Sequence, residues 1–210
     1  MKFALPILLM TVFALTRIPE LMPHNFSAVY AIAFCAGVYF PKKMAWWIPM
    51  LTFFFTDMAL NCYYQFQLAI DVFKISLLIY LAMNYVAYAV LIGLGRKFSP
   101  QSSFASLLGG GIFGALLFYF ITNTASWFFN PFHNPEYTKT VAGWIDALTR
   151  GTHGWPQTWE FFRNTVLSGG LFTGLFVGAM KLSAASEPAE EKPEEKSEEK
   201  PAENPDAAQA

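Results

Sequence analysis

The stretch Phe118-Tyr-Phe-Ile-Thr-Asn-Thr-Ala-Ser-Trp127 predicts the architecture of the whole chain. It is the second half of a long apolar segment that begins near Phe104, and the first half has glycine at positions 109, 110, 111 and 114. At helical spacing, one face of the second half carries four polar side chains: Tyr119, Asn123, Ser126 and Asn130. A helix with a smooth glycine face and a polar stripe is typical of a membrane protein whose interior holds a polar site.

The composition differs from that of an ordinary soluble domain. Of the 210 residues, 54% are hydrophobic and only 14% are charged, against about 25% charged in a typical soluble domain. Segment 183–210 holds nine acidic residues and three lysines, whereas residues 1–182 hold six acidic and eleven basic ones. Because this tail has almost no bulky apolar residue, we predict a membrane domain at 1–182 and a disordered acidic tail at 183–210. A specific partner for the tail is the alternative.

Six apolar segments predict an all-α, six-helix transmembrane bundle: residues 3–15, 26–40, 44–60, 74–95, 104–129 and 156–182. The first could instead be a signal peptide, but it lacks a good small-residue cleavage site, so we favour an uncleaved span. The second and third contain 15 and 17 residues, fewer than the about 20 of a perpendicular crossing. They could tilt, or form a hairpin that does not cross fully.

The loop at 130–155 contains a short predicted helix. Its apolar residues follow helical spacing: Val141, Trp144, Ile145 and Leu148. Thr140 can cap its N-terminus, and Gly151 lies just past its end. Such a segment lies in the membrane interface or covers a cavity. In the last span, glycines at 170, 174 and 178 predict close packing against another helix.

The positive charges predict the orientation in the membrane. With six spans, one side carries the basic residues closest to helix ends: Lys2, Lys42, Lys43, Arg96, Lys97 and Lys181. On the other side the basic residues are spread over longer loops. The positive-inside rule therefore predicts that both termini are cytoplasmic.

Polar side chains of several spans are expected at one level, below the long loop on the outer side. Asp57 is the most informative, because it is predicted near the C-terminal end of the third helix, where the helix dipole disfavours an anion. It is also in an apolar segment and needs a cation or a proton. Arg17 and Arg163 are the candidate cations. A structural ion pair is the alternative to a role in contacting a ligand.

No catalytic or metal motif accompanies these residues. His24, His133 and His153 lie in three separate loops without the spacing of metal ligands. No nucleophile–base pair, phosphate-binding glycine loop or zinc motif occurs in the sequence. We therefore predict that the protein is not an enzyme and has neither a cofactor nor a metal site.

A series of short motifs carries a resemblance to a known family: Pro23-His-Asn-Phe-Ser-Ala-Val-Tyr-Ala31, Thr56-Asp57, Ile121-Thr-Asn-Thr-Ala-Ser-Trp127, Tyr137-Thr-Lys-Thr-Val-Ala-Gly143 and Phe161-Phe-Arg-Asn-Thr165. Over about residues 5–182, the chain resembles an uncharacterised bacterial multi-pass membrane family, known only as a domain of unknown function. That family itself resembles the S components of energy-coupling-factor vitamin transporters, which are six-helix proteins that bind a vitamin or related compound under loop lids.

The resemblance implies an S-component-like fold in the bacterial inner membrane, with a ligand site near the outer face. The residues that it places in or beside this site are Arg17, Asn25, Asp57, Asn123, Trp127, Arg163 and Asn164. Energised uptake would need partner subunits, because the chain has no nucleotide-binding segment.

These observations favour a membrane protein that captures a vitamin-like small molecule as the substrate-binding component of a transporter. Its expected partners are the lipid bilayer, the ligand and energising transporter subunits, with no nucleic acid. The alternative is a non-transporting interaction or scaffold subunit that binds another protein through the glycine stripe 170–178 or the acidic tail. An intramembrane enzyme with Asp57 as its base is the least favoured hypothesis.

Overall fold

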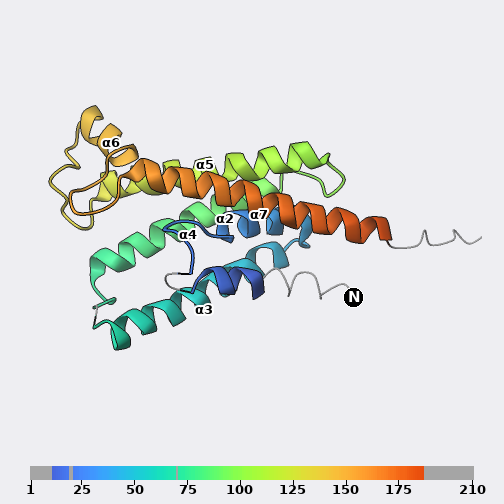
Figure 1. Ribbon diagram of the computed structural model, residues 1–210, viewed down its shortest axis with the longest axis horizontal. Coiled ribbons are helices and arrows are strands. Elements are labelled where there is room, and N and C mark those ends of the chain that lie inside the picture. Colours follow the sequence, from blue (N-terminus) through green and yellow to red (C-terminus); the bar gives the residue numbers. More distant parts are fainter. Residues whose placement is uncertain (1–10, 19–20, 70, 187–210) are drawn as a thin grey trace, which may run out of the picture.

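The fold is all-helical over the residues that the structure describes, which are 11–18, 21–69 and 71–186. In the computed structural model (Figure 1), a helical segment at 11–16 precedes six helices. These are α2 (Val29–Tyr39), α3 (Met44–Gln67), α4 (Ile75–Gly95), α5 (Phe104–Phe129), α6 (Val141–Leu148) and α7 (Thr158–Ser186). The all-α prediction is therefore confirmed for this part of the chain. Most of the predicted first span and the tail from residue 187 lie outside the described residues.

The bounds of α5 and α6 agree with the sequence prediction because their ends are capped. Ser103 Oγ accepts a hydrogen bond from the Ser106 backbone N–H at 3.1 Å, which caps the start of α5. At its other end Asn130 adopts the left-handed conformation, with φ at 41°. Thr140 caps α6 as predicted, since its Oγ1 accepts a bond from the Gly143 N–H at 3.2 Å.

The predicted end of the third helix is wrong. We expected the helix to end at Leu60, but α3 continues to Gln67 and contains 24 residues. The polar run that begins at Asn61 contains no glycine or proline, so nothing in it forces the helix to stop. The chain turns only after Leu68, where Ala69 takes a φ of 53°. Asp57 therefore lies ten residues before the end of α3, too far for the helix dipole to act strongly on it.

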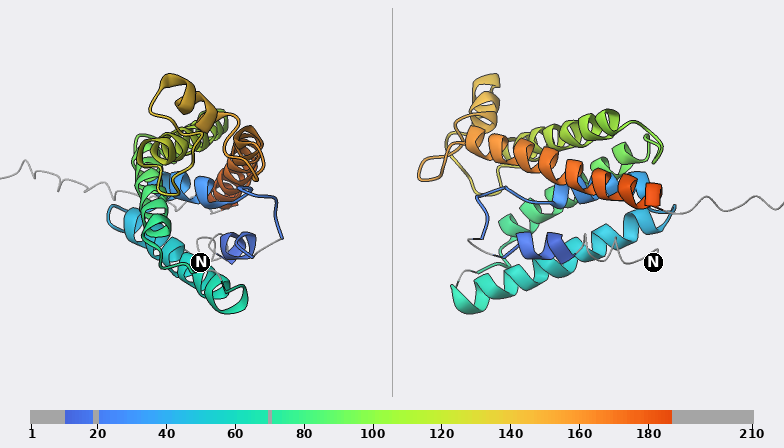
Figure 2. Two further views of the ribbon diagram at one scale, coloured as in Figure 1. Left: turned by 90° about the vertical axis from the view of Figure 1, so that its left-hand side faces the viewer. Right: turned by 45° about the vertical axis from the view of Figure 1, so that its right-hand side comes forward.

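Helix α2 forms the centre of the molecule. Ten of its eleven residues are buried, and it packs against α3, α4, α5 and α7 (Figure 2, left). Its closest contact is with α4, where a Cβ atom on Gly37 would lie 2.2 Å from the Ile92 carbonyl oxygen. A Cβ atom on Gly95 would lie 2.1 Å from the Phe34 carbonyl oxygen. The two backbones thus touch at a pair of glycines, as small residues allow in membrane proteins.

Glycines also bring α5 and α7 together. A Cβ atom on Gly111 would lie 2.2 Å from Thr173 Oγ1, so α7 packs directly on this turn of α5. In the predicted glycine stripe of α7, Gly170 faces Ile112 and Gly174 faces Leu108, whereas nothing lies within 4 Å of a Cβ atom on Gly178. Two of the three glycines are therefore engaged within the molecule.

Three helices of the described part, α4, α5 and α7, are long and apolar enough to cross a membrane, with mean hydropathies of 2.0, 2.0 and 1.4. Helix α2 has only 11 residues, about half of the length of a crossing. Leu167, Leu171 and Leu175 of α7 are 57%, 51% and 56% exposed, so a row of large apolar side chains faces outward. This surface is compatible with contact to lipid. The six-span arrangement stays a prediction.

The long helices run between two opposite ends of the molecule, which are called the loop end and the lysine end (Figure 1). The loop end carries residues 130–157, between α5 and α7. The lysine end carries the turns from α2 to α3 and from α4 to α5 together with the last part of α7, and its basic residues are Lys42, Lys43, Arg96, Lys97 and Lys181.

Candidate functional site

A buried polar cluster joins three segments that are distant in the sequence: Arg17, Asp57 of α3 and Tyr85 of α4. Arg17 Nη2 donates a hydrogen bond to Asp57 Oδ1, and Tyr85 Oη donates to Asp57 Oδ2 at 2.9 Å. The side chains of Arg17 and Asp57 are only 20% and 10% exposed. Both oxygens of the Asp57 carboxylate are therefore bound to a donor.

The structure decides between the two candidate cations. Arg17 forms the ion pair with Asp57. Arg163 instead lies on the exposed surface of α7, with its guanidinium 5.7 Å from the centre of the Trp159 ring. Arg163 is thus separate from the buried cluster.

One buried donor of Arg17 is left without a partner. Its Nε has no hydrogen-bond partner among the described residues. The guanidinium carbon lies 5.9 Å from the centre of the Phe13 ring. Leaving a buried donor unpaired costs about 1–3 kcal/mol, so a hydrogen-bond acceptor for Nε would stabilise the cluster.

An aromatic chain runs from this cluster into the core. Phe13 contacts Phe53 with ring centres 5.2 Å apart, and Phe53 contacts Tyr88 at 4.8 Å. Tyr88 stacks on Phe118 at 5.3 Å, and Phe118 lies 4.7 Å from Tyr30. The cluster is thus flanked by aromatic side chains on α3 and α4, which give its surroundings an apolar character.

Tyr85 is the member of the cluster that sequence reasoning missed. It lies in an apolar helix that also contains Tyr80 and Tyr88. Spacing along α4 does not distinguish a tyrosine that binds Asp57 from one that only packs. The contact depends on how α3 and α4 are placed side by side, which the sequence pattern does not reveal.

Asn123 and Trp127 lie away from this cluster, towards the loop end. Asn123 Nδ2 donates to the Tyr119 carbonyl of its own helix at 2.8 Å. Trp127 Nε1 donates to the Thr138 carbonyl at 2.6 Å. In this structure these two predicted site residues support α5 and its loop.

Several further side chains fasten loop 130–157 to α5. Lys139 Nζ donates to the carbonyl of Trp127 at 2.6 Å and also to that of Phe128. Trp144 Nε1 of α6 donates to Thr124 Oγ1 at 3.0 Å. Tyr119 Oη donates to the Leu148 carbonyl. Of the polar stripe predicted on α5, Tyr119 and Asn130 therefore bind this loop, whereas Asn123 bonds within its own helix.

Asn25 and Asn164 lie apart from both of these regions, at the contact between segment 21–28 and α7. Asn164 Nδ2 donates to the His24 carbonyl at 2.9 Å. Asn25 has a φ of 60°, and its carbonyl accepts a hydrogen bond from Tyr30 Oη at 3.1 Å. Of the predicted site residues, the structure thus brings together Arg17 with Asp57, and Asn164 with the chain next to Asn25.

An open pocket of about 360 Å³ lies within the loop end, and none of the predicted site residues lines it. Glu136 lies on its wall and accepts a hydrogen bond from the His153 backbone N–H at 3.0 Å. That bond, together with the nearby His153 side chain, lowers the pKa of the Glu136 carboxyl. Within the described part of the chain, no group of three or more His, Cys, Asp or Glu residues could hold a metal ion.

Comparison with known proteins identifies the family. A family model matches residues 1–191, nearly the whole chain. The chain belongs to DUF6580, a family of unknown function. Neither a curated protein nor a solved structure matched the chain. Membership of DUF6580 agrees with the expected resemblance to a domain of unknown function, while the likeness to S components stays a prediction.

Proposed function

We propose that this DUF6580 protein is an integral membrane protein that binds a small molecule beside Arg17, Asp57 and Tyr85. The observation that carries this proposal is the unpaired Nε of Arg17, a buried donor next to an otherwise satisfied ion pair. Ionisable residues within membrane segments are costly and usually mark a functional site. The binding site would belong to the substrate-binding component of a transporter in the bacterial inner membrane.

The surroundings of Arg17 suggest the chemistry of the ligand. An oxygen of the ligand would accept a hydrogen bond from Arg17 Nε. Its apolar or ring-shaped part would lie against aromatic side chains such as Phe13 and Phe53. Ligand sites commonly combine an apolar lining with a few polar groups that orient the ligand. A vitamin-like compound with an aromatic ring and a carbonyl or carboxylate group has this chemistry.

Two observations favour binding over the alternatives. Asp57 is engaged by Arg17 and by Tyr85, so it is poorly placed to act as a catalytic base. Gly170 and Gly174 pack against α5, which makes this stripe less available to a partner protein. Trp127 would contribute by holding loop 130–157 against α5, and Asn123 by stabilising its own helix. Asn25, Arg163 and Asn164 would shape the neighbouring surface. Energising subunits would supply the nucleotide-driven step.

Native mass spectrometry of the detergent-purified protein, followed by denaturing extraction, tests the proposal. We expect a stoichiometric small molecule, either co-purified or taken up from a mixture of vitamins and metabolites. Arg17→Lys should keep the ion pair with Asp57 but remove the Nε donor, so the ligand should be lost from a folded protein. Arg150→Lys, at an exposed loop position, is the matched control and should retain it. An unliganded wild-type protein, or equal retention in Arg17→Lys, would contradict the proposal.

A further inference from the structure

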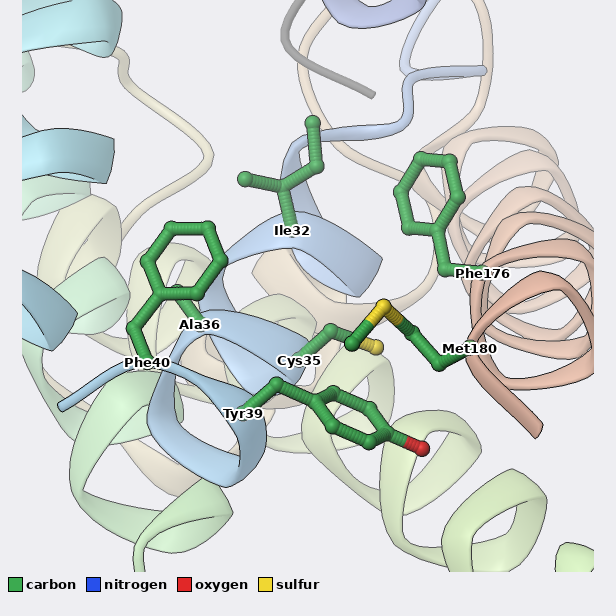
Figure 3. Close-up of a pocket in the computed structure, with 7 residues that line it drawn as sticks. All are labelled: Ile32, Cys35, Ala36, Tyr39, Phe40, Phe176 and Met180. Carbon is green, nitrogen blue, oxygen red and sulfur yellow. The ribbon is translucent and has the colours of Figure 1, made fainter. Parts of the chain in front are cut away.

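An apolar groove lies between α2 and α7 near the lysine end (Figure 3). Cys35, Tyr39 and Phe40 line it on one side, and Phe176 and Met180 of α7 line it on the other. The enclosed space is only about 10 Å³, about the volume needed for one water molecule. The groove therefore suits a thin apolar chain lying along its open side, and it cannot enclose a compact ligand.

Basic residues come directly after the lining residues in the sequence. Lys42 and Lys43 follow Phe40 almost directly, and Lys181 follows Met180. The α4–α5 turn packs against α2, since the Phe98 ring lies 5.2 Å from that of Phe34. None of these three lysines has an ion pair among the described residues, whose salt bridges all lie elsewhere.

Acidic residues are absent from the described part of the lysine end. The described acidic residues lie in the middle of α3, in the α3–α4 turn, in loop 130–157 and at the start of α7: Asp57, Asp71, Glu136, Asp146 and Glu160. A concentration of unpaired lysines beside an apolar groove at the end of membrane-length helices favours an anionic amphiphile. The Tyr39 ring lines the groove, while its hydroxyl points away from Phe176 and Met180 (Figure 3) and is buried without a hydrogen-bond partner among the described residues.

We propose that this groove binds an anionic phospholipid. One acyl chain lies against Phe176 and Met180, and the phosphate is held by Lys42, Lys43 and Lys181. The lipid would fasten α2 to α7 at the lysine end. The lipid site rests on the proposed membrane location. It is separate from the cluster at Arg17, so a protein that binds no small molecule there would still be expected to bind the lipid.

The acidic tail competes with the lipid as the binding partner of these lysines. Its first acidic residue, Glu187, is only six positions after Lys181. Both the full chain and a chain that ends at Ser186 must therefore be measured. A lipid site predicts binding by both proteins, whereas a site occupied by the tail predicts binding only after truncation.

Native mass spectrometry of the delipidated full-length protein, with equal amounts of dioleoyl phosphatidylglycerol and dioleoyl phosphatidylcholine, tests the proposal. We expect preferential retention of one phosphatidylglycerol. Each of Lys42→Gln, Lys43→Gln and Lys181→Gln should weaken this retention about fivefold, the effect of one lysine near an anionic lipid. Lys74→Gln, at the start of α4 and far from the α4–α5 turn, should leave it unchanged, and thermal unfolding should show that each variant is folded.

Four results would overturn the proposal. The first is equal retention of the two lipids by the wild-type protein. The second is unchanged retention in a chain that combines Lys42→Gln, Lys43→Gln and Lys181→Gln. The third is binding that occurs only in the chain ending at Ser186. The fourth is binding of water-soluble glycerol phosphate as tight as that of phosphatidylglycerol, because the acyl chain would then contribute nothing.

Discussion

Arg17 and Asp57 stabilise each other in a place where either one alone would be costly. Their side chains are 20% and 10% exposed, so removing one partner leaves the other as a largely buried, uncompensated charge. Replacing both by apolar residues removes the pair without leaving such a charge. The structural contribution of the pair can therefore be separated from its role in binding a ligand.

We predict that Asp57→Ala destabilises the protein by about 3 kcal/mol, because it leaves the Arg17 charge buried. The double change of Arg17→Met with Asp57→Leu should cost clearly less than Asp57→Ala alone. Thermal or denaturant unfolding in one detergent measures both. If the double variant is less stable than Asp57→Ala, the charges themselves hold the segments together.

Tyr85→Phe should cost about 1–2 kcal/mol, because it removes a hydrogen bond to a charged acceptor without opening a cavity. Tyr63→Phe, at an exposed position of α3, is the matched control and should be nearly neutral in the same unfolding measurement. Equal effects of the two changes would show that the Tyr85 hydroxyl does not support Asp57.

The sequence predicted part of this cluster. An aspartate in an apolar segment had to be paired, and Arg17 was one of two candidates on charge alone. The choice between Arg17 and Arg163, and the presence of Tyr85, depend on contacts between elements. The sequence places Asn123 and Trp127 at one level, but Asn123 bonds within its own helix, and the partner of Trp127 lies in a loop whose path no periodicity specifies.

At the scale of elements, the contact between α2 and α4 limits what the core can tolerate. A Cβ atom on Gly37 would meet the Ile92 carbonyl oxygen at 2.2 Å, and backbone cannot move aside as a side chain does. In contrast, nothing lies within 4 Å of a Cβ atom on Gly93, two residues before Gly95 on the same helix. These positions offer a matched test of helix packing.

Gly37→Ala should destabilise the protein by about 2 kcal/mol or more, because α2 and α4 must separate. Gly93→Ala should be neutral or stabilise it by up to about 1 kcal/mol, since alanine is the better helix former. Melting temperatures of the two variants measure the difference. Similar melting temperatures for both would mean that α2 and α4 do not touch at Gly37.

The loop end should open at acidic pH. The His153 backbone N–H holds the pKa of the Glu136 carboxyl below its ordinary value. The ionised carboxylate therefore contributes stability at neutral pH. This contribution is lost as the pH falls through the lowered pKa of the Glu136 carboxyl in the folded protein.

Hydrogen exchange at the His153 amide, corrected for its intrinsic rate at each pH, should show protection at pH 6 that is lost at pH 3. Glu136→Gln should remove this pH dependence. Protection that is the same at both pH values, or a transition that persists in Glu136→Gln, would exclude Glu136 as the titrating group.

Helix bounds were predicted well where local chemistry sets them. Ser103, Asn130 and Thr140 cap helices in their own sequence neighbourhood, so α5 and α6 begin and end as expected. The end of α3 was missed because Asn61 marks a change in polarity without breaking the backbone. Likewise α7 extends to Ser186, past the predicted end at residue 182, since its small and polar last residues still favour a helix.

At the scale of the whole molecule, both proposals rest on the way the chain crosses a membrane. The ligand site requires a loop end open to the outer side, and the lipid site requires a lysine end at the inner leaflet. Three helices among the described residues have the length and hydropathy for crossing. The sequence pattern predicted these apolar segments. It did not distinguish a membrane span from a core helix, as the short, buried α2 at the centre of the molecule shows.

Cysteine labelling in intact cells tests this arrangement most directly. In a chain with Cys35→Ala and Cys62→Ser, single cysteines are introduced by Thr149→Cys at the loop end or Ser99→Cys at the lysine end, both exposed positions. A membrane-impermeant maleimide should label the Thr149→Cys protein from outside, and the Ser99→Cys protein only after the membrane is permeabilised. Labelling of both proteins from the same side would contradict the account.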